Sequence, residues 1–182
     1  MIGWRRRSGS RGGGGHAFAR ADLAAAREET ESTRNMRAYL QKRRRPMSTD
    51  WKGRCLCGAV QYEARGAAFA QLVCHCRDCQ RASGSAGLPV VVVSAAEFSF
   101  EGDIRSYTIT GGSGMPTTRN SCAHCGSLLF GTPQHAPDIV TIYAGTLDEP
   151  SRFHAEFVQF TSERHQLDAR DPGIAQYAGR AP

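Results

Sequence analysis

The residues best suited to chemistry in this chain are its seven cysteines, which fall into three groups. Thiolates are soft ligands that favour zinc and related ions. Closely spaced cysteines that return at three points of one chain therefore predict metal binding. The groups are a triplet flanked by two pairs, namely Cys74, Cys76 and Cys79, then Cys55 and Cys57, then Cys122 and Cys125.

Disulfides explain this pattern poorly. The odd number of cysteines leaves one unpaired, and cysteines two residues apart are poor candidates for a bridge to each other. No apolar leader of the secretory kind is found, so a reducing, cytoplasmic compartment is the expectation. The longest apolar run, 88–93, is far shorter than the roughly 18–20 residues that span a bilayer, and no membrane partner is expected.

Two cysteine pairs can supply the four thiolates of a closed, structural zinc site. The downstream pair is typical of a zinc knuckle, in which a tight turn with Gly126 aims two sulfurs at one metal. The upstream pair is expected on a strand, where residues two apart share a face. The remaining three cysteines, at 74–79, are then one ligand short of a tetrahedral shell, as in catalytic zinc sites. A thiol bound at that position would lose its proton and could add to a small carbonyl.

The spacing alone leaves alternatives open. Pairing the cysteines at 55 and 57 with those at 74 and 76 is geometrically conceivable. Three thiols together with His75, or with a histidine from elsewhere, could also close a second structural site. We expect His75 to point away from the metal and His124 to be a solvated turn residue.

The positive charge of the chain is concentrated near its N-terminus. The formal net charge is +6, but residues 1–46 hold 12 of the 23 Lys and Arg residues and four acidic ones, a balance of +8. Residues 47–182 hold 11 basic and 13 acidic residues, a balance of −2. The second part therefore has no broad field for a polyanion, and nucleic acid is not an expected partner of this domain.

We expect residues 1–46 to form a disordered basic leader, because their arginines and the glycine run 12–15 cannot bury a core. A solvated helix is compatible with 17–42. Patterned sequence begins at Met47, which favours a biological start there and a leader that is an over-read of the gene. The zinc-binding domain is assigned to 47–182, with its core at about 50–160.

Short alternating or β-branched stretches, broken by Gly, Pro and Asp, predict an all-β domain. The stretches 98–101 and 104–109 are expected to pair as a hairpin, and helix is expected only for a turn or two after Cys79. Edge strands could join two copies, although no residue argues for a homo-oligomer specifically. Strands are expected at 60–63, 88–93, 98–101, 104–109, 117–121, 127–131, 139–146 and 155–160.

Three stretches resemble the glutathione-dependent formaldehyde-activating enzyme family, which also includes a vertebrate centromere protein. They are GRCLCGAV at 53–60, CHCRDCQRASG at 74–84 and CAHCGSLLF at 122–130, in the order and spacing of the family. The resemblance implies an all-β, tent-like zinc fold of the Mss4-like type. It also implies two zinc ions, a structural one held by Cys55, Cys57, Cys122 and Cys125 and a more labile, catalytic one held by Cys74, Cys76 and Cys79.

In that family, the glutathione thiol and formaldehyde combine near the labile zinc into S-hydroxymethylglutathione. The resemblance therefore predicts a carbon–sulfur lyase that acts on glutathione or a similar small thiol and on formaldehyde or a related carbonyl. Arg77, Arg81 and Arg119 are candidates for contacts with the carboxylates of glutathione. The alternatives are a zinc-stabilised binding module without turnover, with the leader on nucleic acid or an acidic partner, and a thiol-based metal or redox sensor.

Overall fold

The computed structural model describes residues 50–111, 114–166, 168 and 173–181. The predicted leader at 1–46, its helix and the predicted start at Met47 lie outside these residues. Within the described residues, eleven strands form two sheets and are accompanied by a single α-helix of seven residues. The prediction of an all-β, Mss4-like zinc-type fold is confirmed, because the molecule is mostly β and its cysteines gather in two clusters. No helix in this part of the chain is long and apolar enough to cross a membrane.

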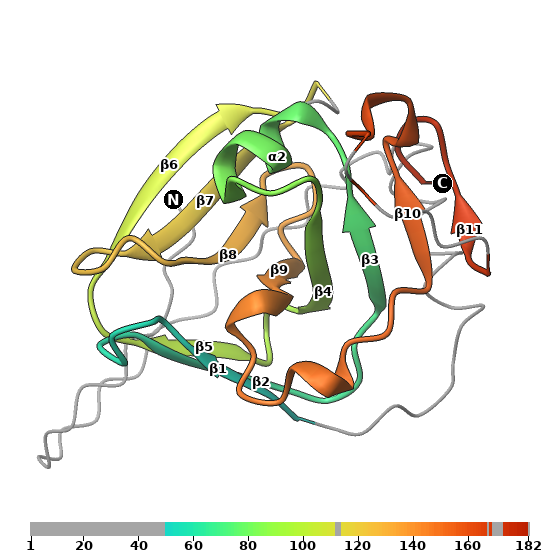
Figure 1. The fold of residues 1–182 in the computed structure, drawn as a ribbon. Coiled ribbons are helices and arrows are strands. Elements are labelled where there is room, and N and C mark those ends of the chain that lie inside the picture. Colours follow the sequence, from blue (N-terminus) through green and yellow to red (C-terminus); the bar gives the residue numbers. More distant parts are fainter. Residues whose placement is uncertain (1–49, 112–113, 167, 169–172, 182) are drawn as a thin grey trace, which may run out of the picture.

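The smaller sheet has three antiparallel strands in the order β1–β2–β5. In Figure 1 it lies at the bottom of the view, against the larger, curved sheet. Its strands are β1 (Asp50–Arg54), β2 (Gln61–Arg65) and β5 (Phe98–Glu101).

The larger sheet has the strand order β11–β10–β3–β4–β9–β8–β7–β6. Strand β10 runs parallel to both of its neighbours, β3 and β11, while the other neighbouring pairs are antiparallel. The strands are β3 (Ala70–Cys74), β4 (Leu88–Ser94), β6 (Ile104–Thr110), β7 (Pro116–Cys122), β8 (Leu128–Pro133), β9 (Ile139–Tyr143), β10 (Phe157–Gln159) and β11 (Ala175–Gln176).

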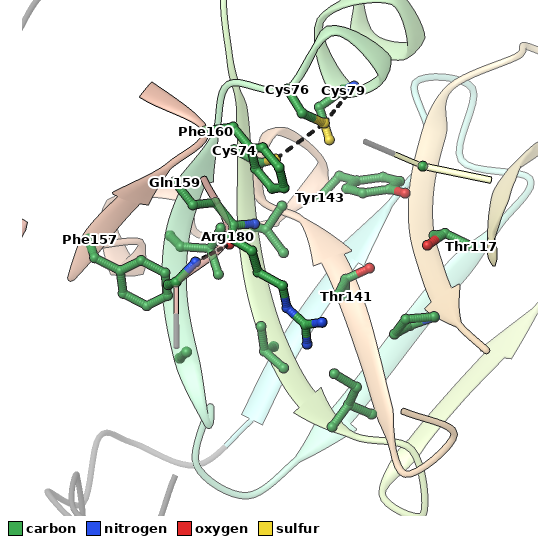
Figure 2. Close-up of a pocket in the computed structure, with 18 of the residues that line it drawn as sticks. Cys74, Cys76, Cys79, Thr117, Thr141, Tyr143, Phe157, Gln159, Phe160 and Arg180 are labelled. Atoms are coloured by element: carbon green, nitrogen blue, oxygen red, sulfur yellow. Dashed lines mark hydrogen bonds between the residues drawn. The ribbon is translucent and has the colours of Figure 1, made fainter. Parts of the chain in front are cut away.

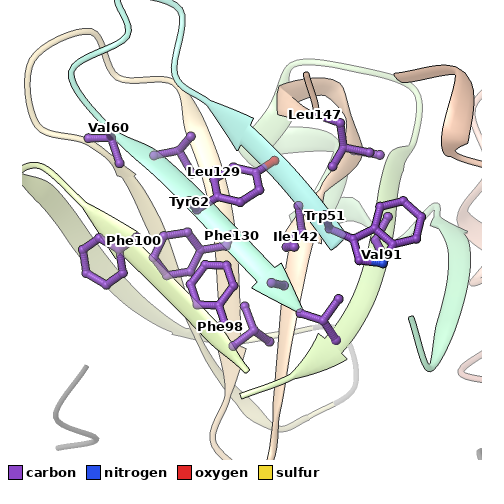
Figure 3. Close-up of a cluster of buried hydrophobic side chains, with 14 of the residues drawn as sticks. Trp51, Val60, Tyr62, Val91, Phe98, Phe100, Leu129, Phe130, Ile142 and Leu147 are labelled. Atoms are coloured by element: carbon purple, nitrogen blue, oxygen red, sulfur yellow. The ribbon is translucent and has the colours of Figure 1, made fainter. Parts of the chain in front are cut away.

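The main core lies between the two sheets and is built around aromatic rings (Figure 3). Phe98 of the smaller sheet packs on Phe130 of the larger one, with ring centroids 4.8 Å apart, and Tyr62 packs on Phe98 at 6.0 Å. Trp51 is 2% exposed, and the Arg152 guanidinium lies 4.9 Å from its ring centroid. These contacts fix the smaller sheet on one face of the larger sheet.

The two faces of the larger sheet have different roles, because successive side chains of a strand point to opposite faces. In β4, Val91 and Val93 belong to the main core, whereas Val90 and Val92 belong to a second apolar cluster on the other face. That second cluster also contains the cysteine triplet at 74–79. The continuous valine run of β4 is therefore buried on both sides, as expected for a central strand.

The predicted hairpin of 98–101 and 104–109 is wrong, although both strands exist. Strand β5 pairs with β2 in the smaller sheet, and β6 pairs with β7 in the larger one. The chain crosses between the sheets at Gly102, which has a φ of +98°. A Cβ atom there would lie 2.1 Å from the Ala59 carbonyl oxygen, so the crossing depends on glycine.

Three local expectations also need correction. Cys55 and Cys57 are not on a strand, because β1 ends at Arg54 and a turn follows. Helix α2 (Arg77–Ser83) begins before Cys79 instead of after it. The strand expected at 139–146 ends at Tyr143. Three 3₁₀ turns complete the fold, namely η1 (Ala144–Thr146), η2 (Pro150–Arg152) and η3 (Thr161–Glu163).

Candidate functional site

The structure brings the two cysteine pairs together into one cluster. The four sulfurs of Cys55, Cys57, Cys122 and Cys125 all lie within 4.8 Å of one another. Cys55 Sγ is 3.4 Å from Cys57 Sγ, which is 3.9 Å from Cys122 Sγ. Two sulfurs bound to one tetrahedral zinc at about 2.3 Å are about 3.8 Å apart, so the cluster fits a single metal ion. All seven cysteines are free thiols.

The turn after β1 and the turn after β7 bring these sulfurs together. After β1, the Gly58 amide donates to the Cys55 carbonyl at 3.1 Å, and the Val60 amide donates to Cys55 Sγ at 3.2 Å. After β7, the Cys125 amide donates to Cys122 Sγ at 3.5 Å. Such N–H donors stabilise thiolates and orient metal ligands. The donor set therefore suits a thiophilic ion such as zinc.

The cysteine triplet forms a second, separate cluster. Cys74 is the last residue of β3, Cys76 caps the N-terminus of α2, and Cys79 lies in the first turn of that helix. Their sulfurs also lie within 4.8 Å of one another, with Cys74 Sγ 3.5 Å from Cys76 Sγ. The Cys79 amide donates to Cys76 Sγ at 3.4 Å. All three cysteines are buried, and three sulfurs at this spacing also fit one metal ion.

Electrostatics within the triplet favour one thiolate over three. Contacts with the Cys74 and Cys76 sulfurs and with the Arg119 guanidinium lower the pKa of Cys79 to about 3. In contrast, the neighbouring Cys76 and Cys79 sulfurs raise the pKa of Cys74 far above its usual range. Three adjacent thiolates repel one another, and a divalent cation is the ordinary means of holding them together.

His75 lies between two of these cysteines but faces away from their sulfurs. It is 1% exposed, and its Nδ1 lies 3.2 Å from the Ala86 carbonyl oxygen. Its Nε2 lies 3.5 Å from Asp168 Oδ2, and Asp168 also pairs with Arg164 at 3.0 Å. His75 thus connects the segment that carries the cysteine triplet, 74–79, to the C-terminal part of the chain. Its ring nitrogens are not among the clustered donor atoms. His124 is exposed, as expected.

The 3₁₀ turn η3 also supports the segment that carries the cysteine triplet. The Arg77 amide donates to Glu163 Oε2 at 2.8 Å. The buried Gln80 side chain donates to two carbonyl oxygens, those of His75 at 2.5 Å and Glu163 at 2.8 Å. These bonds connect the first turn of α2 to η3. They hold the triplet in place without using its sulfurs.

A cavity of about 170 Å³ opens beside the cysteine triplet (Figure 2). Its walls come from alternate residues of β3, β4 and β9, such as Leu72, Val90 and Thr141, together with Phe157 and Phe160. The three cysteines of the triplet line it, and none of the four cysteines of the other cluster does.

Two polar side chains lie where the cavity meets the triplet. Arg119 donates to Cys79 Sγ at 3.6 Å and to the Tyr143 hydroxyl oxygen at 3.3 Å. Burial raises the pKa of Tyr143 to about 12, so its hydroxyl keeps its proton at neutral pH. Of the three arginines considered from the sequence, Arg119 is the one that lines the cavity, while Arg77 and Arg81 are not among the described lining residues.

Sequence reasoning missed several polar residues that line the cavity, among them Tyr143, His135 and Arg180. Tyr143 ends a predicted strand, and the alternation of that strand could have placed it on the same face as Thr141. For His135 and Arg180 we find no local signal in the sequence, because tertiary contacts alone bring them to the cavity.

If each cluster holds a zinc ion, the two ions should differ in lability. A mild chelator should remove the zinc of the triplet first, because it has three protein ligands instead of four. Cys76→Ser should lose that zinc with little change in thermal stability. Cys122→Ser should lower the free energy of unfolding by roughly 4 kcal/mol or more, since a structural metal contributes folding energy. Zinc analysis and thermal unfolding measure both effects, and two equally resistant ions would contradict the distinction.

A solved structure and a family model are similar to this chain. A crystal structure of a Rhodobacter sphaeroides protein is similar, with 16% sequence identity and a TM-score of 0.44 over 69% of this chain and 98% of that chain. No curated protein matches the sequence. The family model for the glutathione-dependent formaldehyde-activating enzyme matches residues 50–163. The chain therefore belongs to the glutathione-dependent formaldehyde-activating enzyme family.

Proposed function

We propose that this protein is a zinc-dependent carbon–sulfur lyase. It would form or cleave the adduct between a small thiol, such as glutathione, and formaldehyde or a related carbonyl compound. The observation that carries the proposal is that the three-cysteine cluster lines a cavity and the four-cysteine cluster does not. A metal with three protein ligands keeps a position for a further ligand, and the cavity gives a small molecule access to it.

Cys74, Cys76 and Cys79 would hold the zinc ion, which when bound supplies a site where a substrate thiol loses its proton at neutral pH. In the forward direction a bond forms between the thiolate sulfur and the carbonyl carbon. The π electrons of the C=O bond move to the oxygen, which takes up a proton. The proton released by the thiol balances this uptake, so the reaction needs no oxidant or reductant.

Arg119 and Tyr143 are suited to stabilise the oxygen on which negative charge develops. Arg119 is a permanent cation at the triplet end of the cavity, and it holds the Tyr143 hydroxyl through a hydrogen bond of 3.3 Å. Tyr143 keeps its own proton, because burial raises its pKa to about 12. Donors that are fixed before the reaction, in a site with little water, are an effective way to stabilise an oxyanion.

The direct test is NMR detection of exchange between glutathione and its formaldehyde adduct. The full chain with both metals bound should accelerate this exchange above the rate of buffer alone. Cys76→Ser should abolish the acceleration, because it removes one of three ligands, while Ala82→Ser, at an exposed position of the same helix, should retain it. Equal exchange rates for wild type and Cys76→Ser would eliminate the lyase proposal for this substrate pair.

The role given to Tyr143 predicts a separable effect. Tyr143→Phe should lower the rate of adduct exchange by about tenfold to a hundredfold, because it removes one donor to the developing oxyanion. Its zinc content should stay at the wild-type value. Tyr107→Phe is the matched control, since Tyr107 is 67% exposed on β6. If both variants keep the wild-type rate, Tyr143 has no part in the reaction.

A further inference from the structure

The C-terminal segment 173–181 completes the cavity, although it lies beyond the part of the chain that matches the family, which ends at residue 163. Its strand β11 pairs with β10, and the Phe160 amide donates to the Gly179 carbonyl at 2.7 Å. The Tyr177 ring packs edge-on against Phe157, with centroids 5.8 Å apart. Arg180 and Ala181 are thereby brought to the cavity wall.

Arg180 places a second positive charge in the cavity. In Figure 2 its side chain extends into the cavity, and its guanidinium is turned away from the sulfurs of the cysteine triplet. Burial lowers the pKa of Arg180. Burial, together with the charge of Arg180, also lowers the pKa of His135, which lines the cavity as well. Among the described lining residues there are two arginines and no Asp or Glu.

The two arginines have different surroundings. Arg119 lies against the sulfur of Cys79 and so offsets negative charge of the triplet. The Arg180 guanidinium is instead turned away from these sulfurs (Figure 2), so its charge acts at a different part of the cavity. The nearby His135 Nδ1 is buried and has no hydrogen-bond partner among the described residues. This part of the cavity therefore suits an anionic group that accepts hydrogen bonds.

The space between the triplet and Arg180 is small and apolar. Its walls include Leu72, Val90, Val92, Ile139 and Phe157. The volume of about 170 Å³ is close to that of a cavity that accepts a benzene ring, about 150 Å³. Glutathione is larger than such a ring and is polar along its whole length, so only part of it would lie between these walls.

We propose that the preferred ligand is a small thiol whose apolar body carries a single carboxylate, and that Arg180 determines this specificity by pairing with the carboxylate. The thiol end of this assignment rests on the function proposed above, whereas the carboxylate end rests on Arg180 and the walls alone. The C-terminal segment is in this account a specificity element added to the family domain.

Binding of three probes to the full chain tests the recognition of the thiol and the recognition of the carboxylate separately. The probes are meta-mercaptobenzoate, benzenethiol, which lacks the carboxylate, and benzoate, which lacks the thiol. With both metals bound, calorimetry should give about tenfold tighter binding of meta-mercaptobenzoate than of benzenethiol, the usual gain from one charge-assisted pair. Benzoate should bind with equal affinity whether or not the labile metal has been removed by chelation.

Arg180→Gln should weaken the binding of meta-mercaptobenzoate and of benzoate by about tenfold and leave benzenethiol within about twofold. Arg180→Lys should recover part of the loss. Arg105→Gln, at an exposed position of β6, is the matched control and should change none of the affinities. An unchanged zinc content in Arg180→Gln would show that the variant keeps its fold.

Equal binding of meta-mercaptobenzoate and benzenethiol by the wild type would overturn the proposal. So would equal losses for all three probes in Arg180→Gln, because that result indicates a structural role for the arginine. Failure of the lyase function has a different outcome. In that case benzoate still binds in an Arg180-dependent manner, although no adduct exchange is observed.

Discussion

Mutual repulsion between closely spaced thiolates is the constraint on which the rest of this structure depends. Within each of the two cysteine clusters, the sulfurs lie within 4.8 Å of one another. Neither cluster can ionise fully without a cation between its sulfurs. The four-cysteine cluster joins the turn after β1 to the turn after β7 and so connects the two sheets. The three-cysteine cluster joins β3 to α2 on the other face of the larger sheet.

The larger sheet separates the main core from the cavity beside the triplet. One face, with Val91, Val93 and Phe130, packs against the smaller sheet as an ordinary core. The opposite face, with Val90, Val92 and Tyr143, forms the walls of the cavity beside the triplet. Because successive residues of one strand serve opposite faces, the same strands that stabilise the domain also define what the cavity accepts. The C-terminal segment then adds the charge of Arg180 to that of Arg119, which lies on β7.

Much of this organisation is local in the sequence and could therefore be predicted. The spacing within each cysteine group indicated metal binding, and the valine run of β4 indicated a central strand. The pairing of strands that are distant in the sequence was harder to predict. The strands at 98–101 and 104–110 join different sheets, because Gly102 packs against the backbone of Ala59. Arg180 has no local signal at all, since only the pairing of β11 with β10 carries it to the cavity. The assignment of individual cysteines as zinc ligands stays a prediction.

The central claim is that the metal of the triplet, unlike that of the four-cysteine cluster, takes a ligand from the cavity. Cadmium NMR of the protein with both zinc ions replaced by an NMR-active cadmium isotope tests this claim most directly. Two resonances are expected, of which one shifts on addition of a small thiol and is lost in Cys76→Ser. A thiol that shifts neither resonance, or that shifts the one lost in Cys122→Ser, would contradict it.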